Sequence, residues 1–403
     1  MTLRSKFWIH TAAFLFVFAI LLQTGFWLAG KKFLWNDEIF TQFSSINQPY
    51  KEMLLGEIQE GSNSPLFYVG QKLLCDLAHS DATQRMENAV GAGNHFPWYL
   101  PEAYSQIFLR INSVFFMSLA ISLIFYFFLR FYSVWGALYS LLLSISSFTV
   151  WVYWAEARPY SLWFLLTTTQ SLLFLCLMEL RGNVQADSSV VRRAWHCLAA
   201  NHLILSFSSI FSIMQILIVS FLLWIFLEKD WRKYLALTVL PSMVCMVYYR
   251  LTPRYHFIFN DTPWQLINAN FPKDRLVITV LFAVFLLFDY FLISKQKPKQ
   301  NKSLSERSYL ALTFLMLLVA GIVLWKFKME EPADHKGFAI SNRYFIYLTP
   351  VGIISTTLFS ISIFRSLTKK VWLQIFFLIF IGLLSVGRID RTYELLKSYF
   401  QFQ

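Results

Sequence analysis

The sequence predicts an all-α, polytopic membrane protein with about eleven transmembrane helices in a single integral membrane domain over 1–403. Apolar residues make up 57% of the chain and charged residues 14%, and the mean hydropathy is +0.50. This balance is typical of a chain whose solvent is mostly lipid. Apolar windows long enough to cross a bilayer recur along the whole chain, and basic residues gather in alternate connections between them.

Each predicted span is a predominantly apolar window of roughly 14 to 23 residues, against the ~20 that a crossing needs. The windows are 7–29, 107–129, 134–152, 160–180, 195–210, 213–227, 234–249, 276–293, 309–325, 345–363 and 371–384. The first window is too long for the apolar region of a signal peptide, so we expect an uncleaved anchor. The boundary at 206–212 stays open, because FSSIFS fits either a tight turn between two short spans or the middle of one span.

The charge distribution orients the chain with its N-terminus in the cytoplasm. The connections that then fall inside are short and nearly all basic, as the positive-inside rule requires. The net charge of +12 therefore reflects topology and contact with anionic membrane lipid. No basic patch with interleaved aromatic residues is present, so we expect no nucleic-acid partner. Compact loops and modest length favour a bacterial inner (plasma) membrane over the endoplasmic reticulum.

Three extracytoplasmic loops carry most of the carboxylates, and the longest of them, 30–106, is expected to be functional. Within it, 65–78 predicts a short helix lying in the membrane interface. The smaller outer loops are 251–274 and 326–343, and parts of the outer loops are expected to shape acceptor choice. The four cysteines show neither a disulfide framework nor zinc-ligand spacing.

An acidic pair, Asp37-Glu38, follows the first span at the outer membrane surface. A carboxylate in a partly desolvated site there can act as general base toward a hydroxyl. Neighbouring residues point in different directions, so we expect only one of the two to face a reaction. Taken alone, such a pair is also typical of a solvated surface loop.

Two further segments place an arginine beside a tyrosine at an outer helix start. In the first, Glu156-Ala157-Arg158-Pro159-Tyr160, the proline suits the first turn of a helix. Arg158 then lies at headgroup depth, where it either binds a lipid phosphate with both guanidinium arms or pairs with Glu156. The second is Asn342-Arg343-Tyr344, which also fits an ordinary interfacial arginine with a tyrosine of the aromatic belt.

Together these segments resemble the GT-C superfamily of glycosyltransferases that use polyprenyl-phosphate sugars. The resemblance is to the branch with protein O-mannosyltransferases and the bacterial aminoarabinose transferase of lipid A. It covers most of the chain in order: Asp-Glu after the first span, NSPLFY, LRINS at the second span, EARPYSLW, and NRYFIYLTP. Asn63, in NSPLFY, stands where many relatives have histidine, so the role of that histidine is not carried over.

The resemblance implies inverting transfer of a sugar, a hexose or pentose, from a polyprenyl-phosphate donor to a hydroxyl of an extracytoplasmic lipid, glycan or protein acceptor. Asp37 would be the catalytic base by match to the acid of the family's first loop. Glu38 would support it by hydrogen bonding or by contacting a divalent ion.

The remaining site residues follow from the same resemblance. Arg158 and Arg343 would stabilise the negative charge on the departing polyprenyl phosphate, with Tyr160 and Tyr344 donating hydrogen bonds to it or packing on the lipid. Asn63 and Glu156 are expected to bind the acceptor or support the site. No cofactor is required, although a divalent metal is allowed. The outer-loop histidines lack ligand spacing; they are His79, His95, His256 and His335.

Other function classes fit the composition as well. A membrane transporter is the main rival, but transporters tend to carry ionisable residues or helix breaks at mid-membrane. In this sequence Gln215 and Pro241 are among the few such residues, and polar residues concentrate at the outer rim. Two further hypotheses stay open: a noncatalytic assembly subunit of the same fold and, within the enzyme class, a lipid-linked oligosaccharide transferase or ligase.

Overall fold

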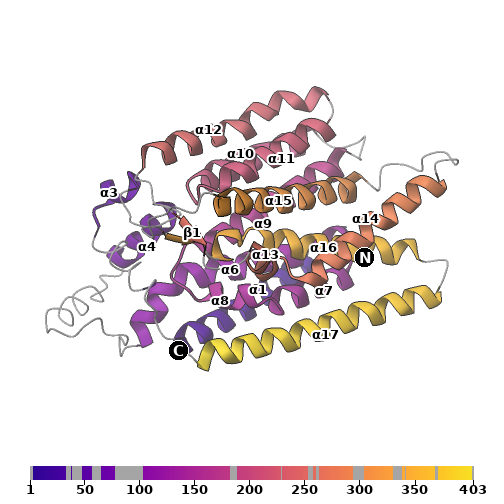
Figure 1. Cartoon of the computed structure of the whole chain (residues 1–403), viewed down its shortest axis with the longest axis horizontal. Coiled ribbons are helices and arrows are strands. Elements are labelled where there is room, and N and C mark those ends of the chain that lie inside the picture. Colours follow the sequence, from indigo (N-terminus) through magenta and orange to yellow (C-terminus); the bar gives the residue numbers. More distant parts are fainter. Residues whose placement is uncertain are drawn as a thin grey trace.

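Apolar runs form helices here because a helix satisfies its own backbone hydrogen bonds, as a lipid environment demands. In the computed structural model the helices lie side by side in one bundle (Figure 1). The residues it describes are 3–32, 38, 48–56, 65–77, 103–181, 188–227, 229–252, 257–259, 263–293, 304–329, 338–340, 342–367 and 371–401.

Helices form every described element of the first part of the chain, from the N-terminus through the long outer loop to residue 251. They are α1 (Leu3–Lys31), α3 (Tyr50–Leu54), α4 (Pro65–Leu77), α6 (Ala103–Phe131), α7 (Val134–Ile145), α8 (Phe148–Trp154), α9 (Tyr160–Arg181), α10 (Ser188–Ser206), α11 (Ser212–Phe226) and α12 (Leu235–Leu251). A 3₁₀ helix, η2 (Lys229–Tyr234), leads into α12.

The rest of the chain adds helices and two very short strands. They are β1 (Phe257–Phe259), α13 (Pro263–Asn270), α14 (Lys273–Ile293), α15 (Leu304–Met329), β2 (Phe338–Ile340), the 3₁₀ helix η3 (Asn342–Phe345), α16 (Leu348–Ser366) and α17 (Val371–Gln401). β1 and β2 pair in parallel, with Phe257 opposite Phe338. The pairing brings the predicted loops 251–274 and 326–343 together, and it adds a small sheet to a fold expected to be all-α.

In the described part of the chain, seven helices are long and apolar enough to cross a membrane: α1, α6, α9, α12, α15, α16 and α17. Counting the bent pair α7 and α8 as one span brings the number to eight. Helices also cover the other predicted windows, as α10, α11 and α14, but they fall outside that count. The chain is therefore polytopic, and a total of eleven crossings stays a prediction.

The centre of the bundle is formed by α9 and α16, where 78% of each apolar window is buried. α9 packs against α6 and α10, and α16 packs against α14 and α15. The last helix, α17, lies along the edge of the bundle (Figure 1), with only 17% of its window buried. The two faces of α17 therefore differ, and most of its apolar surface is left for lipid.

Two span predictions need correction. The window 134–152 is not one straight helix, because α7 and α8 meet at a 69° bend at Ser146-Ser147. The hydroxyl of Ser147 donates to the Leu143 carbonyl at 2.6 Å, a side-chain bond of the kind that competes with the helical ladder. The last helix, predicted over 371–384, continues to Gln401 through the charged GRIDR segment. The open boundary at 206–212 proves to be a turn between α10 and α11.

Candidate functional site

Glu38, in the predicted outer loop 30–106, is held by several hydrogen bonds. Arg110, in the first turns of α6, binds both of its carboxylate oxygens: Nε donates to Oε1 at 2.8 Å and a terminal nitrogen donates to Oε2 at 2.6 Å. The backbone N–H of Ala157 also donates to Oε1, at 2.8 Å. Both members of the ion pair are buried, with side chains 0% exposed. This acid is therefore not a solvated surface group.

Arg110 also ties the end of α1 to the site. Its second terminal nitrogen donates to the backbone carbonyls of Ala29 and Lys32, at 2.8 and 2.5 Å. Both carbonyls lie at the C-terminal end of α1, where the last carbonyl groups of a helix find no N–H donor within the helix. A single guanidinium thus bonds both to the end of α1 and to the Glu38 side chain.

Glu156 lies in the turn between α8 and α9 and pairs with Lys32 across 3.4 Å. Lys32 also donates to the Val152 carbonyl at 3.0 Å. Glu156 is 1% exposed, and its second oxygen, Oε1, accepts no hydrogen bond from the residues that the structure describes. An unbonded oxygen in a buried carboxyl group disfavours the ionised form.

The two buried carboxyl groups titrate in opposite directions. Burial alone would raise the pKa of Glu38, but the charge and hydrogen bonds of Arg110 outweigh burial, so its pKa lies below the ordinary value. Burial raises the pKa of Glu156 above the ordinary value, and the negative charge of Glu38 adds to that rise against the opposing charge of Lys32. At any given pH, Glu38 is therefore ionised to a greater extent than Glu156.

The predicted donor-phosphate residues join this cluster. The positive charges of Arg158 and Arg343 both act on Glu156, which places the two outer helix starts at one site. Arg158 stacks on the Tyr160 ring, 5.7 Å from its centroid, and donates to its hydroxyl at 3.4 Å. Arg343 stacks on the Tyr344 ring at 5.6 Å. Each arginine is thus held by the tyrosine that the sequence places beside it.

The NSPLFY segment reaches the same end of the bundle. The predicted interfacial helix forms as α4, and Asn112 of α6 donates its amide to the Gln71 side chain of α4 at 3.0 Å. Leu73 and Leu77, toward the end of the predicted apolar face, are 51% and 70% exposed, whereas Leu66 and Val69 of the same face are partly buried against the protein core. Two predicted site residues, Asp37 and Asn63, lie outside the described residues.

The structure unites four of the sequence segments, namely the acidic pair through Glu38, LRINS, EARPYSLW and NRYFIYLTP, and it adds Lys32 to them. We shall call Lys32, Glu38, Arg110, Glu156, Arg158 and Arg343 the outer charge cluster, where outer means the side that the charge distribution of the sequence predicts to be extracytoplasmic. Lys32 and Arg110 were not assigned roles from the sequence. Both lie at or near the end of a predicted span. A charged residue there could have indicated a site residue, because a charge in or near the membrane must be paired with another group.

Metal ligation has no support in the described residues, which contain no group of three His, Cys, Asp or Glu side chains able to hold a metal ion. The four outer-loop histidines lie outside those residues. All four cysteines are free, as the spacing predicts.

A second polar group lies inside the bundle, where the sequence predicted few polar residues. Nδ1 of His202 bonds to the Thr238 carbonyl at 2.9 Å, so that nitrogen carries the proton and Nε2 accepts from the Gln170 amide, also at 2.9 Å. Gln215 accepts from Trp163 at 2.9 Å. These groups join α9 to α10, α11 and α12, and their mutual bonds give them a packing role.

Comparisons with known proteins do not identify the chain: no family model, no curated protein and no solved structure matches it. The functional assignment therefore rests on the residues of the outer charge cluster and on the order of the sequence segments that build it.

Proposed function

We propose that the chain is an inverting glycosyltransferase that moves a sugar from a polyprenyl-phosphate donor to a hydroxyl of an extracytoplasmic acceptor. The observation that carries the proposal is the convergence of three segments in one cluster: Glu38 of the acidic pair and the EARPY turn, both buried, and the half-buried Arg343 of the NRY turn. The described part of this cluster holds four cationic side chains and two carboxyl groups, one of them with a raised pKa. This surplus of positive charge suits the binding of a phosphate group.

In the proposed reaction, an acceptor oxygen forms a bond to the anomeric carbon of the sugar while the bond from that carbon to the phosphate oxygen breaks. The electron pair of the broken bond leaves with the polyprenyl phosphate, and the acceptor proton passes to Asp37. Glu38 positions its neighbour through the bonds from Arg110 and Ala157. Arg158 and Arg343 stabilise the leaving phosphate in a site from which water is largely excluded.

A groove on the bundle surface suits the long tail of such a donor. It lies between α14 and α15, has a volume of about 850 Å³, and its lining is apolar apart from Thr279 and Arg307. α13, which precedes α14, packs against both α15 and η3, the helix that carries Arg343. A prenyl chain in this groove would have its outer end near the phosphate-binding arginines.

The test is transfer from defined donors by the purified full-length protein in proteoliposomes. Polyprenyl phosphate carrying a radiolabelled hexose or pentose is supplied with a membrane extract as acceptor, and release of polyprenyl phosphate is followed. We expect Arg158→Ala and Arg343→Ala each to lower turnover by about two to three orders of magnitude and to weaken donor binding. The matched control is Arg250→Ala, which removes an exposed arginine at the outer end of α12.

Turnover in both cluster variants equal to that of the control would overturn the assignment of these arginines. Wild-type protein that releases no polyprenyl phosphate from any hexosyl or pentosyl donor would overturn the proposed activity itself.

A transporter is the second candidate, because the structure contains a broken span, α7 and α8, and a buried histidine in α10. Both features occur in transporters. The histidine is bonded on both ring nitrogens to protein groups, which favours packing over a conduit. Uptake or efflux by proteoliposomes in the absence of any acceptor would favour the transporter.

A further inference from the structure

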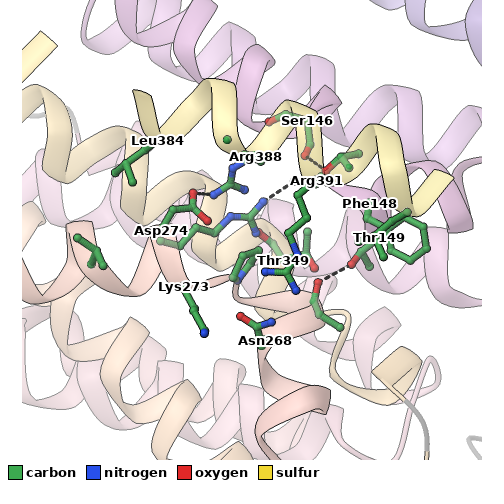
Figure 2. Close-up of a pocket in the computed structure, with 18 of the residues that line it drawn as sticks. Ser146, Phe148, Thr149, Asn268, Lys273, Asp274, Thr349, Leu384, Arg388 and Arg391 are labelled. Atoms are coloured by element: carbon green, nitrogen blue, oxygen red, sulfur yellow. Dashed lines mark hydrogen bonds and ion pairs between the residues drawn. The ribbon is translucent and has the colours of Figure 1, made fainter. Parts of the chain in front are cut away.

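A pocket of about 520 Å³ lies between α17 and the rest of the bundle, and the outer charge cluster contributes none of its lining (Figure 2). It is bounded by the bend between α7 and α8, by the end of α13 and start of α14, by the start of α16, and by the second half of α17. Since η3 directly precedes α16, the pocket lies toward the same end of the bundle as Arg343.

Charge sets this pocket apart from an ordinary gap between helices. Four cationic side chains and one carboxylate line it: Lys273, Arg275, Arg388, Arg391 and Asp274. Figure 2 shows Arg388 and Arg391 extending from α17 toward the start of α14. In a protein that meets lipid over most of its surface, such a collection of cations is costly unless it binds negative charge.

Two of the four cationic side chains are bonded to other protein groups, and the other two are exposed. Arg388 is buried and forms an ion pair with Asp274. Arg275 is fully buried, donates to the Asn270 and Thr349 carbonyls at 3.2 and 3.0 Å, and donates to the Ser147 hydroxyl. Lys273 and Arg391 are exposed at the pocket. The single carboxylate is therefore already paired.

The residues that line the pocket also stabilise the bend at Ser146-Ser147. The Thr392 hydroxyl of α17 donates to the Ser146 carbonyl at 2.7 Å, a carbonyl that the broken helix leaves without a helical partner. Non-helical backbone at membrane depth is tolerated where protein covers it or where it lines a polar cavity. Hydrogen bonds from Arg275 of α14 and Thr392 of α17 thus hold the polar residues of the pocket, Ser146 and Ser147, in place.

We propose that this pocket binds the headgroup phosphate of an anionic membrane lipid, with Lys273 and Arg391 as its phosphate ligands and the lipid tail against the apolar wall. The wall is provided by Leu383, Leu384 and Val277. α17 lies at the edge of the bundle with most of its apolar surface exposed, so a lipid reaches the pocket laterally. The binding is separate from glycosyl transfer and does not rest on it.

The experiment measures lipid binding to the purified full-length protein in detergent by native mass spectrometry. The protein is titrated with phosphatidylglycerol, with phosphatidylcholine, and with inorganic phosphate as a competitor of phosphatidylglycerol. The test variant is Lys273→Gln/Arg391→Gln, which changes only exposed side chains. The control is Arg250→Gln/Lys397→Gln, which removes the same charge from exposed positions outside the pocket lining, the second of them on α17 itself.

We expect wild type to prefer phosphatidylglycerol, the test variant to bind it roughly tenfold or more weakly, and the control to keep wild-type affinity. Equal binding of the two lipids by wild type, or an equal loss in both double variants, would overturn the proposal. Displacement of phosphatidylglycerol by an equal concentration of inorganic phosphate would also overturn it, because the site would then belong to a soluble anion.

Discussion

Arg110 is the residue on which the outer charge cluster depends most. Its guanidinium donates hydrogen bonds to both carboxylate oxygens of Glu38 and to a backbone carbonyl at the end of α1. Removing one partner of a buried pair leaves an uncompensated charge, which typically costs about 3–5 kcal/mol. Arg110→Ala is therefore expected to lower the stability of the folded protein by that amount.

Thermal unfolding in detergent checks this expectation, with the exposed Arg250→Ala variant as control. Arg110→Lys should lie between wild type and Arg110→Ala, because lysine restores the charge but cannot bind a carboxylate with a planar fork. An Arg110→Ala protein as stable as the control would show that Glu38 is not held as described.

Glu156 gives a second test at this scale, through pH. Its folded-state pKa is raised, so the stability that protonated Glu156 contributes is fully present below the unfolded-state pKa of about 4.3. That stability is lost as pH rises through the folded-state value. Glu156→Gln mimics the protonated form and removes this titration. The unfolding temperature of wild type, relative to Glu156→Gln, should therefore fall as the pH rises from about 4.3. A relative rise would show that the carboxyl group is ionised and stabilised by Lys32.

The sequence predicted Glu38, Glu156, Arg158 and Arg343 as site residues, but not how they are paired. The partners of Glu38 and Glu156 lie 72 and 124 residues away in the chain. No local pattern encodes such distances, because helix packing decides which span ends meet. Sequence order did indicate that the segments belong together, whereas the ionisation of each carboxyl group required their geometry.

At the scale of elements, close packing of α14 against α16 supports both the bundle centre and the pocket between α17 and the rest of the bundle. A methyl group on Gly352 of α16 would approach Cδ of Arg275 to 2.8 Å and the Phe271 ring to 2.9 Å. Both neighbours are buried, so Gly352→Ala should destabilise the protein by about 1–3 kcal/mol through overpacking. Gly382→Ala in α17 is the matched control, since nothing described lies within 4 Å of its added methyl group.

Thermal unfolding of the two alanine variants measures this difference. Gly382→Ala should be neutral or slightly stabilising, because alanine is the better helix former. If Gly352→Ala unfolded no earlier than Gly382→Ala, the packing of α14 against α16 would be looser than described.

The elements themselves show what periodicity and hydropathy can and cannot predict. Helices form in all the apolar windows, because an apolar run of span length favours the membrane, where a helix satisfies its own backbone hydrogen bonds. The bend at Ser146-Ser147 was missed, since serine hydroxyls within an apolar run scarcely change its hydropathy. The end of α17 was placed too early for the opposite reason: Arg388 and Asp390 lower the hydropathy although the helix continues. Arg388 is tolerated there because Asp274 pairs with it.

For the whole molecule, the central claim is that separate helix ends meet to form one site for phosphate-linked sugar transfer. The end of α1, the start of α6, the α8–α9 turn and the start of α16 supply the outer charge cluster. A polytopic fold can gather these ends at one pole, which explains why the signals are short and scattered in the sequence. Asp37 and Asn63 lie outside the described residues, so their positions stay predictions, and the roles of all the site residues in sugar transfer stay proposals.

The measurement that tests the claim most directly compares sugar transfer by wild type, Asp37→Asn and Glu52→Gln, the last of which removes another carboxylate from the same loop. An amide cannot accept the acceptor proton, so Asp37→Asn should lose about two to four orders of magnitude in turnover. It should keep wild-type folding and donor binding, while Glu52→Gln should remain active. Wild-type turnover by Asp37→Asn would contradict the assignment of Asp37 as the base.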